Sequence, residues 1–141
     1  MRDCVFCQII EGSLPASVVH RDDKIIAFMD INPVNSGHVL VVPLAHSVGL
    51  SDTDEETGAH LFRMGMRVQK AIRLSGVPCE GINLFLADGQ AAFQDVFHVH
   101  LHVFPRYKGD QFRIEADWSK RPPRDELDEV AARIRSAFPA G

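Results

Sequence analysis

The stretch His98-Val99-His100-Leu101-His102-Val103-Phe104 alternates imidazole and apolar side chains. In a β-strand, side chains at positions i, i+2 and i+4 lie on one face, about 7 Å from one to the next. The pattern therefore predicts a strand from about Val96 to Phe104, ended by Pro105, with three imidazoles on one face. Such a row of imidazoles can surround one small anionic group.

Three interpretations fit three imidazoles on one face of a strand. Packing alone explains a single strand histidine better than it explains three. Three histidines and a water can hold a catalytic zinc ion, although a regular alternating triple does not easily converge on one tetrahedral ion. An imidazole can also attack phosphorus as a nucleophile, while its neighbours stabilise charge or pass a proton.

The composition is that of one globular domain. The 141 residues are 45% hydrophobic and 24% charged, and 15 basic against 19 acidic side chains give a formal net charge of −4. This length predicts a single domain over residues 1–141. A mildly acidic chain without a basic stripe is a poor candidate for binding a nucleic acid polymer, whereas a single nucleotide needs only local donors.

The sequence also predicts where the protein works. It has no apolar run near the ~20 residues of a membrane span, and Met1-Arg2-Asp3-Cys4 lacks the apolar stretch of a secretion signal. We therefore expect a cytoplasmic protein without a membrane partner. Two of the three cysteines form the spacing Cys4-x-x-Cys7, which in a reducing compartment favours metal binding or redox chemistry over a structural disulfide.

The order of elements predicts an α+β fold in which helices group around an antiparallel sheet of about five strands. A long helix is expected to begin at Thr53, which fits a capping box with Glu56, and to stop at Gly76 and Pro78. The other expected elements are strands at 17–20, 24–29, 38–42 and 81–87 and helices at 5–10 and 124–138.

Four segments together resemble the histidine triad (HIT) family of nucleotide hydrolases and transferases. Besides the triad, three segments match in the expected order: Cys4-Val5-Phe6-Cys7-Gln8-Ile9-Ile10, Ala27-Phe28-Met29-Asp30-Ile31-Asn32-Pro33, and Gly37-His38-Val39-Leu40-Val41-Val42-Pro43 leading to His46. The resemblance covers a motif-bearing body, 4–106, and leaves 107–141 as a C-terminal helical extension. It implies a HIT-like fold and a homodimer whose sheets join across a two-fold axis.

The resemblance implies a catalytic role for two of the triad histidines. His100 would attack the α-phosphorus of a purine nucleoside 5′-phosphate derivative, and water would release the nucleotide from the nucleotidyl-histidine that forms. His102 would contact phosphate oxygens and offset their charge. Gln94 would lie beside the phosphate as a neutral donor. The implied substrates are a diadenosine polyphosphate or a phosphoramidate.

The resemblance also implies a nucleoside pocket. Asp30 matches the family residue that accepts hydrogen bonds from the two ribose hydroxyls, a geometry that a carboxylate suits. The alternative for Asp30 is a turn or N-cap role ahead of Pro33. Four side chains match the apolar walls of the base pocket, with ordinary core packing as the alternative: Phe6, Ile9, Phe28 and Ile31.

Zinc-containing members of the family imply a second site in this chain. Cys4 and Cys7 would join His46 and His98 in a closed, tetrahedral, structural zinc site. Such a site would pin the N-terminal segment against the triad strand and help to orient His100. The alternative is two free cysteines, with His46 and His98 serving only as a hydrogen-bonding scaffold.

Three residues depart from the family's pattern: Phe93 and Asp95 stand where many members have Gly and Ser or Thr, and Ala87 stands where many have Asn. An ionised Asp95 near a phosphate costs about 4 kcal/mol at ~4 Å in a surface-like dielectric. The leaving group therefore stays open between an amine and a polyphosphate, which Arg106 and Lys108 would attract.

Other functions also remain open at this point. A nucleotide-binding sensor or scaffold with little turnover would keep Asp30 and the apolar pocket but would not need His100 as a nucleophile. A nucleotidyl transferase or phosphorylase would use the same intermediate with another acceptor. A metal-dependent hydrolase would use the three triad histidines as ligands.

Overall fold

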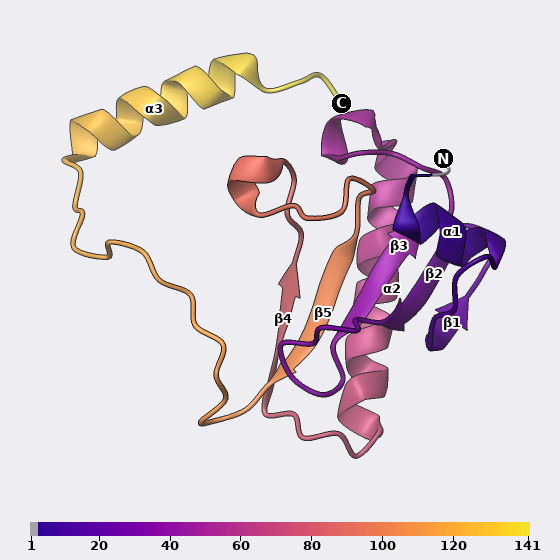
Figure 1. The fold of residues 1–141 in the computed structure, drawn as a ribbon. Helices are drawn as coiled ribbons and strands as arrows, with labels where there is room; N and C mark the ends of the chain where they lie inside the picture. The colour runs from indigo at the N-terminus through magenta and orange to yellow at the C-terminus, as the bar shows by residue number, and fades with distance from the viewer. Residues whose placement is uncertain (1–2) are drawn as a thin grey trace.

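The computed structural model describes residues 3–141. Met1 and Arg2, which open the N-terminal stretch that was compared with a secretion signal, lie outside the described residues. One sheet contains five antiparallel strands in the order β1-β2-β3-β5-β4 (Figure 1). The strands are β1 Val18–Arg21, β2 Ile25–Met29, β3 Val39–Pro43, β4 Gly81–Phe85 and β5 Leu101–Arg106. The helices are α1 Val5–Glu11, α2 Glu55–Leu74 and α3 Arg124–Ala137, with short 3₁₀ turns η1 Leu50–Asp52 and η2 Gln90–Ala92. The predicted α+β fold is confirmed.

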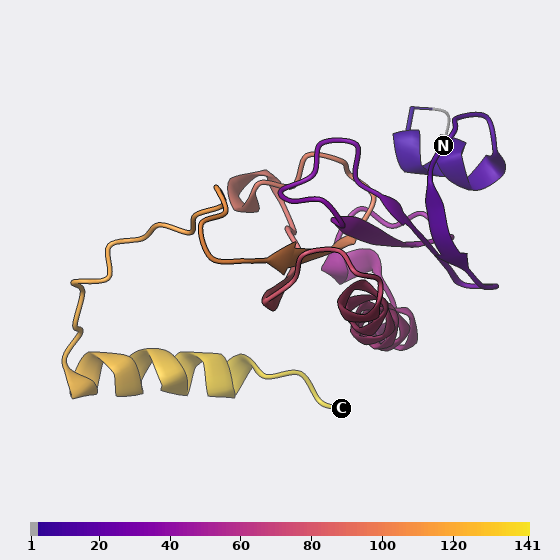
Figure 2. The same cartoon turned by 90° about the horizontal axis from the view of Figure 1, so that it is seen from below.

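Side chains that alternate along the central strands form two apolar layers. On one face, Ile25, Val41 and Val103 pack against α2 in the larger layer of the core. On the other face, Ile26 and Val42 pack against Phe6 of α1 and its neighbours. Figure 2 shows α2 and α1 on these opposite faces of the sheet. No helix among residues 3–141 is long and apolar enough to cross a membrane.

The long helix α2 begins one residue later than its capping-box pattern predicts. Asp54, not Thr53, is the N-cap, and its carboxylate accepts the backbone N–H of Thr57. Thr53 keeps an extended backbone and donates its hydroxyl to the carbonyl of Gly49, because it closes the η1 turn. The predicted end is confirmed, since α2 stops at Leu74 and Gly76 adopts a φ of 88°.

The strand that carries the triad begins later than predicted, at Leu101 and not near Val96, and it continues through Pro105 to Arg106. β3 pairs with β5 only from Leu101 to Val103, so His98 and His100 lie in an irregular segment just before the strand. The backbone N–H of Val99 donates there to Ser47 instead of to a neighbouring strand. Pro105 belongs to β5 because it lies beyond the β3 pairing, where a missing N–H is tolerated.

The C-terminal extension separates from the sheet in both views (Figures 1 and 2). Its first residues are anchored, because the buried Asp110 carboxylate accepts two hydrogen bonds from Arg106 and one from Asn35. The predicted helix α3 is present, yet it contains no buried residue. Its apolar side chains, including Leu127 and Ile134, are exposed.

Candidate active site and metal centre

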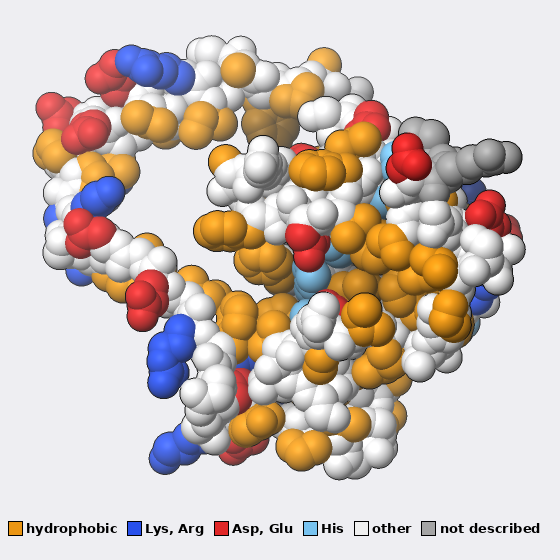
Figure 3. Space-filling model, in the orientation of Figure 1, with side chains coloured by type: hydrophobic (Ala, Val, Ile, Leu, Met, Phe, Trp, Pro, Cys, Tyr) orange, Lys and Arg blue, Asp and Glu red, His pale blue; other side chains and the backbone are white. Residues whose placement is uncertain are grey.

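A cavity of about 320 Å³ opens on the α1 face of the sheet. Apolar side chains from α1, β2 and the loops beside them line most of it, and its polar lining is Asp30, Asn32, Asp95, His100 and His102. In Figure 3, histidine side chains lie at the centre of a hollow surrounded by hydrophobic side chains. The structure thus brings two triad histidines into this cavity, and the expected row of three around one anion is not formed.

His100 presents a free ring nitrogen to the cavity. Its Nδ1 lies 2.7 Å from the carbonyl oxygen of His98, and since a carbonyl only accepts, Nδ1 carries the proton. Its Nε2 therefore keeps a lone pair, with the nearest carboxylate oxygen, Oδ1 of Asp95, 3.6 Å away. The ring of Phe6 packs edge-on against the buried His100 ring, with centroids 5.0 Å apart. These contacts hold the unprotonated Nε2 of His100 in one orientation.

His102 has its tautomer set by a neighbouring histidine. The backbone N–H of Val34 donates to Nδ1 of His38 at 3.0 Å, so the proton of neutral His38 is on Nε2. That atom lies 2.9 Å from Nδ1 of His102, which must therefore accept. Neutral His102 consequently carries its proton on Nε2 and can donate it to a ligand.

The pKa values of both imidazoles favour this neutral pair. Burial, with the nearby His100 and His38 as further causes, lowers the pKa of His102 to about 4. Burial also lowers the pKa of His38, although the Asp30 carboxylate opposes that shift. At neutral pH, His102 is therefore an N–H donor and not a cation in the free protein.

Asp30 is in a position to fill both of the roles considered for it, in the turn and at the cavity. Oδ1 accepts the backbone N–H of Asn32 at 2.8 Å, the turn role that was the alternative. Oδ2 lies 3.5 Å from Nε2 of His38 and 4.0 Å from Nδ1 of His102. Asp30 also lines the cavity, so a ligand with hydroxyl groups could reach it there.

All four predicted wall residues line the cavity: Phe6, Ile9, Phe28 and Ile31. Phe6 and Phe28 are also members of the smaller core layer, so the packing alternative holds for them as well. Ile31 is different because it is 91% exposed. The core-packing alternative therefore does not hold for Ile31, which borders the cavity from the surface.

Gln94 is placed away from the cavity lining. Its amide nitrogen donates to the carbonyls of Val48 at 2.6 Å and Val96 at 3.1 Å. Its amide oxygen accepts the backbone N–H of Gly89 at 2.8 Å. The buried Gln94 amide therefore ties the loop before the triad to the loop after β3.

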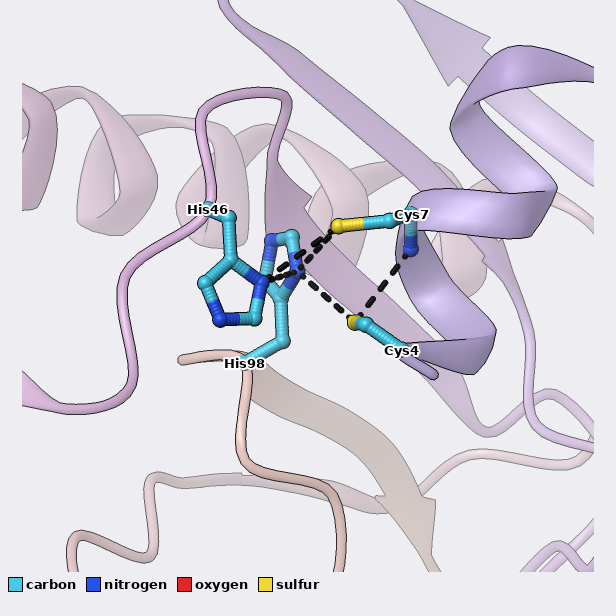
Figure 4. Close-up of side chains that lie close together, drawn as sticks. All are labelled: Cys4, Cys7, His46 and His98. Carbon is cyan, nitrogen blue, oxygen red and sulfur yellow. Dashed lines mark hydrogen bonds between the residues drawn. The ribbon is translucent and has the colours of Figure 1, made fainter. Parts of the chain in front are cut away.

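Cys4, Cys7, His46 and His98 lie together, with one possible ligand atom from each within 4.8 Å of the others (Figure 4). Nε2 of His98 lies 2.8 Å from the carbonyl of Pro43 and so carries the proton, which leaves Nδ1 free to face both sulfurs. Nδ1 of His46 lies 3.3 Å from the Cys7 sulfur. Nδ1 of His46 is also 3.2 Å from Nδ1 of His98, and two thiols with two imidazole nitrogens form a donor set that suits tetrahedral zinc.

His98 therefore faces the cysteines while His100 and His102 line the cavity. This division does not support three triad histidines binding a single ion. A second acidic and histidine cluster, Asp30, His38 and His102, also places its possible ligand atoms within 4.8 Å. In that cluster, however, Nδ1 of His38 already accepts a backbone N–H, and its Nε2 contacts His102.

His38 is the site residue that the sequence reasoning left without a role. The signal that could have found it is the register of β3 against β5, which a single sequence does not show: Leu40 is directly opposite His102, and His38 precedes Leu40 by two positions. Side chains two apart on a strand share a face, so His38 and His102 had to lie on the same side.

Comparison with known proteins identifies relatives in one family, the HIT family. The model of the HIT domain matches residues 11–109. An uncharacterized HIT-like protein of Borreliella burgdorferi is 42% identical over 113 residues, which are 79% of this chain and 81% of that protein. The adenylylsulfatase HINT3 of Arabidopsis thaliana is 33% identical over 134 residues, which are 95% of this chain and 66% of that protein.

Two solved structures resemble the whole chain. A member of the HIT family from Bacillus subtilis superposes with a TM-score of 0.89 at 30% identity, over 99% of each chain. A zinc-bound histidine triad family protein from Mycobacterium smegmatis superposes with a TM-score of 0.77 at 41% identity, over 97% of this chain and 99% of that one.

Proposed function

We propose that this chain, which belongs to the HIT family, hydrolyses purine nucleoside 5′-phosphate derivatives at the α-phosphorus. The observation that carries the proposal is the unprotonated Nε2 of His100, held at the wall of a cavity that Asp30 and apolar side chains also line. The name of the Arabidopsis relative, adenylylsulfatase, supports an adenylyl group as the part of the substrate that is transferred.

The reaction uses the His100 ring nitrogen twice. The Nε2 lone pair forms a bond to the α-phosphorus, and the bond from phosphorus to the leaving group breaks with its electron pair on the leaving group, which takes a proton. Water then attacks the nucleotidyl-histidine, the nitrogen–phosphorus bond breaks, and its electron pair returns to Nε2. The sum is substrate plus water giving a nucleoside monophosphate and the protonated leaving group. Splitting one substitution into two in this way lowers each barrier.

The other cavity residues bind the substrate around that nitrogen. The Nε2–H of His102 donates to a phosphoryl oxygen as charge develops on it. Oδ2 of Asp30 accepts from ribose hydroxyls, and the base packs between Phe28 and Ile31. Gln94 supports this arrangement through the loop before the triad, because its amide is already engaged with backbone groups.

Zinc in the Cys4, Cys7, His46 and His98 site is proposed to be structural. Four protein donors complete a tetrahedron and leave no open position for a substrate. Bound zinc would tie α1, which carries Cys7 and the pocket residue Phe6, to the segment before β5. His98 would then connect the two sites, because its backbone carbonyl accepts the Nδ1 proton of His100.

Intact mass spectrometry after rapid quench tests this function directly. Adenosine 5′-phosphoramidate should add the mass of one adenylyl group to the wild-type chain and map to His100. His100→Asn should bind nucleotide without acquiring that mass, and His20→Asn, at an exposed histidine on β1, should behave like the wild type. Absence of any adenylyl adduct and of product from the wild type would overturn the proposal.

The same experiment separates a nucleotide sensor from a hydrolase. One observation favours the sensor: the Asp95 carboxylate lies 3.6 Å from the nucleophilic nitrogen, where it opposes an incoming phosphate. A sensor would bind the nucleotide tightly and give product no faster than His100→Asn. A transferase or phosphorylase would form the adduct and release it faster when an alcohol or inorganic phosphate is added.

The whole chain, 1–141, is proposed to act as one domain within a homodimer. β4 is the last strand of the sheet and hydrogen-bonds only to β5, so one edge is open. The α3 helix exposes Leu127, Val130 and Ile134, and a single amphipathic helix of this length is unstable without a surface to pack on. A second copy would cover both features. The free cysteines of the zinc site require a reducing compartment, and we propose the cytoplasm.

A further inference from the structure

Asp95 occupies an unusual position beside the nucleophile. It lies in the irregular segment before β5, and its Oδ1 is 3.6 Å from Nε2 of the buried His100. Its side chain is nevertheless 78% exposed. The backbone around it is held, because the neighbouring Gln94 is hydrogen-bonded to Val48 and Val96. Oδ1 of Asp95 also accepts the backbone N–H of Val96 at 2.9 Å, so both the backbone and the carboxylate are held in place beside His100.

Asp95 is also the residue shared by three cavities that meet at this point. It lines the nucleoside cavity, a second one bordered by Cys4 and His46, and a third one bordered by Phe85 and His102. A leaving group displaced by His100 departs on the side of the phosphorus opposite Nε2. Whichever of the three cavities receives it, the Asp95 carboxylate is part of the wall.

Within residues 3–141, these cavities offer no basic side chain to an anion. Among the described residues, none of the three linings includes a Lys or an Arg. Arg106, expected from the sequence to attract a polyphosphate, gives its guanidinium to Asp110, Asn83 and the carbonyl of Phe112. An anionic leaving group would therefore meet Asp95 without compensation, whereas a cationic one would meet a carboxylate that is hydrogen-bonded to the backbone N–H of Val96 and not paired with a Lys or an Arg.

We propose that Asp95 determines leaving-group specificity by charge: it favours α-phosphoryl substrates whose leaving group carries a positive charge, such as a diamine, and disfavours polyphosphate and sulfate. This inference rests on the proposed function, since it concerns the same reaction at the same phosphorus. It explains what the carboxylate of Asp95 would do at a position just before the triad where many family members have Ser or Thr. A neutral Ser or Thr at that position would not discriminate by charge.

Three adenosine 5′-phosphoramidates with leaving amines of similar size provide the test. Their tails are an ammonium (1,2-diaminoethane), a methyl group (propylamine) and a carboxylate (glycine), so only the charge beyond the reacting nitrogen differs. Adenylyl sulfate is a fourth substrate with an anionic leaving group of another kind. For the wild type we expect kcat/KM to be about tenfold higher for the ammonium tail than for the carboxylate tail, the scale of partly screened pair interactions acting in both directions.

Variants separate charge from shape. Asp95→Asn removes the charge and keeps the size, and it should bring the ammonium-to-carboxylate ratio close to one. Asp95→Glu keeps the charge and should retain most of the ratio. Asp23→Asn removes a carboxylate from the turn between β1 and β2, outside all three cavities, and should leave the ratio unchanged. Added salt should reduce the ratio in the wild type and not in Asp95→Asn.

The outcomes distinguish this inference from the function on which it rests. If no substrate forms an adenylyl-His100 adduct, the proposed hydrolase fails. If the phosphoramidates form the adduct and the wild-type ratio equals that of Asp95→Asn, or if Asp95→Asn does not raise kcat/KM for adenylyl sulfate relative to the wild type, the hydrolase stands and the role of Asp95 is overturned.

Discussion

Nε2 of His38 lies 2.9 Å from Nδ1 of His102, and the proton between these two atoms belongs to His38. The direction follows because Nδ1 of His38 already accepts the backbone N–H of Val34. A backbone amide in the loop before β3 therefore decides which nitrogen of His102 carries the proton. The side chain of His38 therefore links the backbone of Val34 to the ring of His102.

Replacing His38 should disturb His102 without removing it. His38→Leu takes away the donor, so the ring proton of His102 can then sit on either Nδ1 or Nε2. Because only the Nε2–H form donates to the substrate in the proposed reaction, we expect kcat to fall about tenfold or more. His38→Gln keeps an amide donor and should recover part of the activity. Long-range ¹H–¹⁵N spectra should show the Nε2–H tautomer of His102 in the wild type and a mixture in His38→Leu. An unchanged tautomer in His38→Leu would contradict this assignment.

Removing a zinc ligand should release the metal and destabilise the fold. We expect one zinc per chain in the wild type and less than a tenth of that in Cys4→Ser, with a loss of roughly 3 kcal/mol in unfolding free energy. Burial and the adjacent Cys4 raise the pKa of the Cys7 thiol in the free protein, so zinc binding should release protons. Elemental analysis and denaturant titration measure both effects. Cys79→Ser is the matched control, and a similar metal loss there would exclude this ligand set.

The stability of the protein should fall as the solution becomes mildly acidic. The pKa of His102 is about 4 in the folded chain and near 6.5 when unfolded, so the unfolded state binds the extra proton first. Between about pH 6.5 and about pH 5 this difference removes about 1.5 kcal/mol of unfolding free energy. Equilibrium denaturation at several pH values should show the decline in the wild type and a flatter dependence in His102→Gln. Equal slopes in the two proteins would refute the assignment to His102.

Two glycines of α2 should respond to alanine in opposite directions. A Cβ at Gly65 would lie 2.7 Å from Cδ2 of Leu101, so Gly65→Ala forces the helix away from β5 and should cost about 1–3 kcal/mol. A Cβ at Gly58 meets nothing within 4 Å, and Gly58→Ala should stabilise the helix by about 0.5–1 kcal/mol. Thermal and denaturant unfolding measure both changes. Two stabilising substitutions would show that α2 does not need the close approach.

The exposed face of α3 should hold the proposed dimer together. Leu127 is 41% exposed and Ile134 is 62% exposed, and replacing both with Asp should convert a dimer into a monomer in light scattering after gel filtration. Arg133→Glu breaks only the exposed pair with Glu129 and should leave the mass unchanged. A wild-type monomer would refute the dimer, while a dimer that survives the double substitution would place its interface elsewhere.

Local patterns were sufficient for the architecture and for much of the site. The alternation correctly separated His102 from Leu101 and Val103, because strand geometry places successive side chains on opposite faces, whereas His98 and His100 lie before the strand. Helix signals likewise located α2 to within a residue or two. The residues that the resemblance to the HIT family implied lie together at the cavity and around the two cysteines, except Gln94, and His38 was not among them.

What only the tertiary structure decided concerns partners far apart in the chain. β5 begins at Leu101 because β3 pairs with it only there, and a single sequence does not show where its pairing partner ends. The free nitrogens of His98, His100 and His102 depend on Pro43, on a neighbouring carbonyl and on His38. Protonation of a ring nitrogen follows from the atom opposite it, and the folded chain alone determines which atom that is.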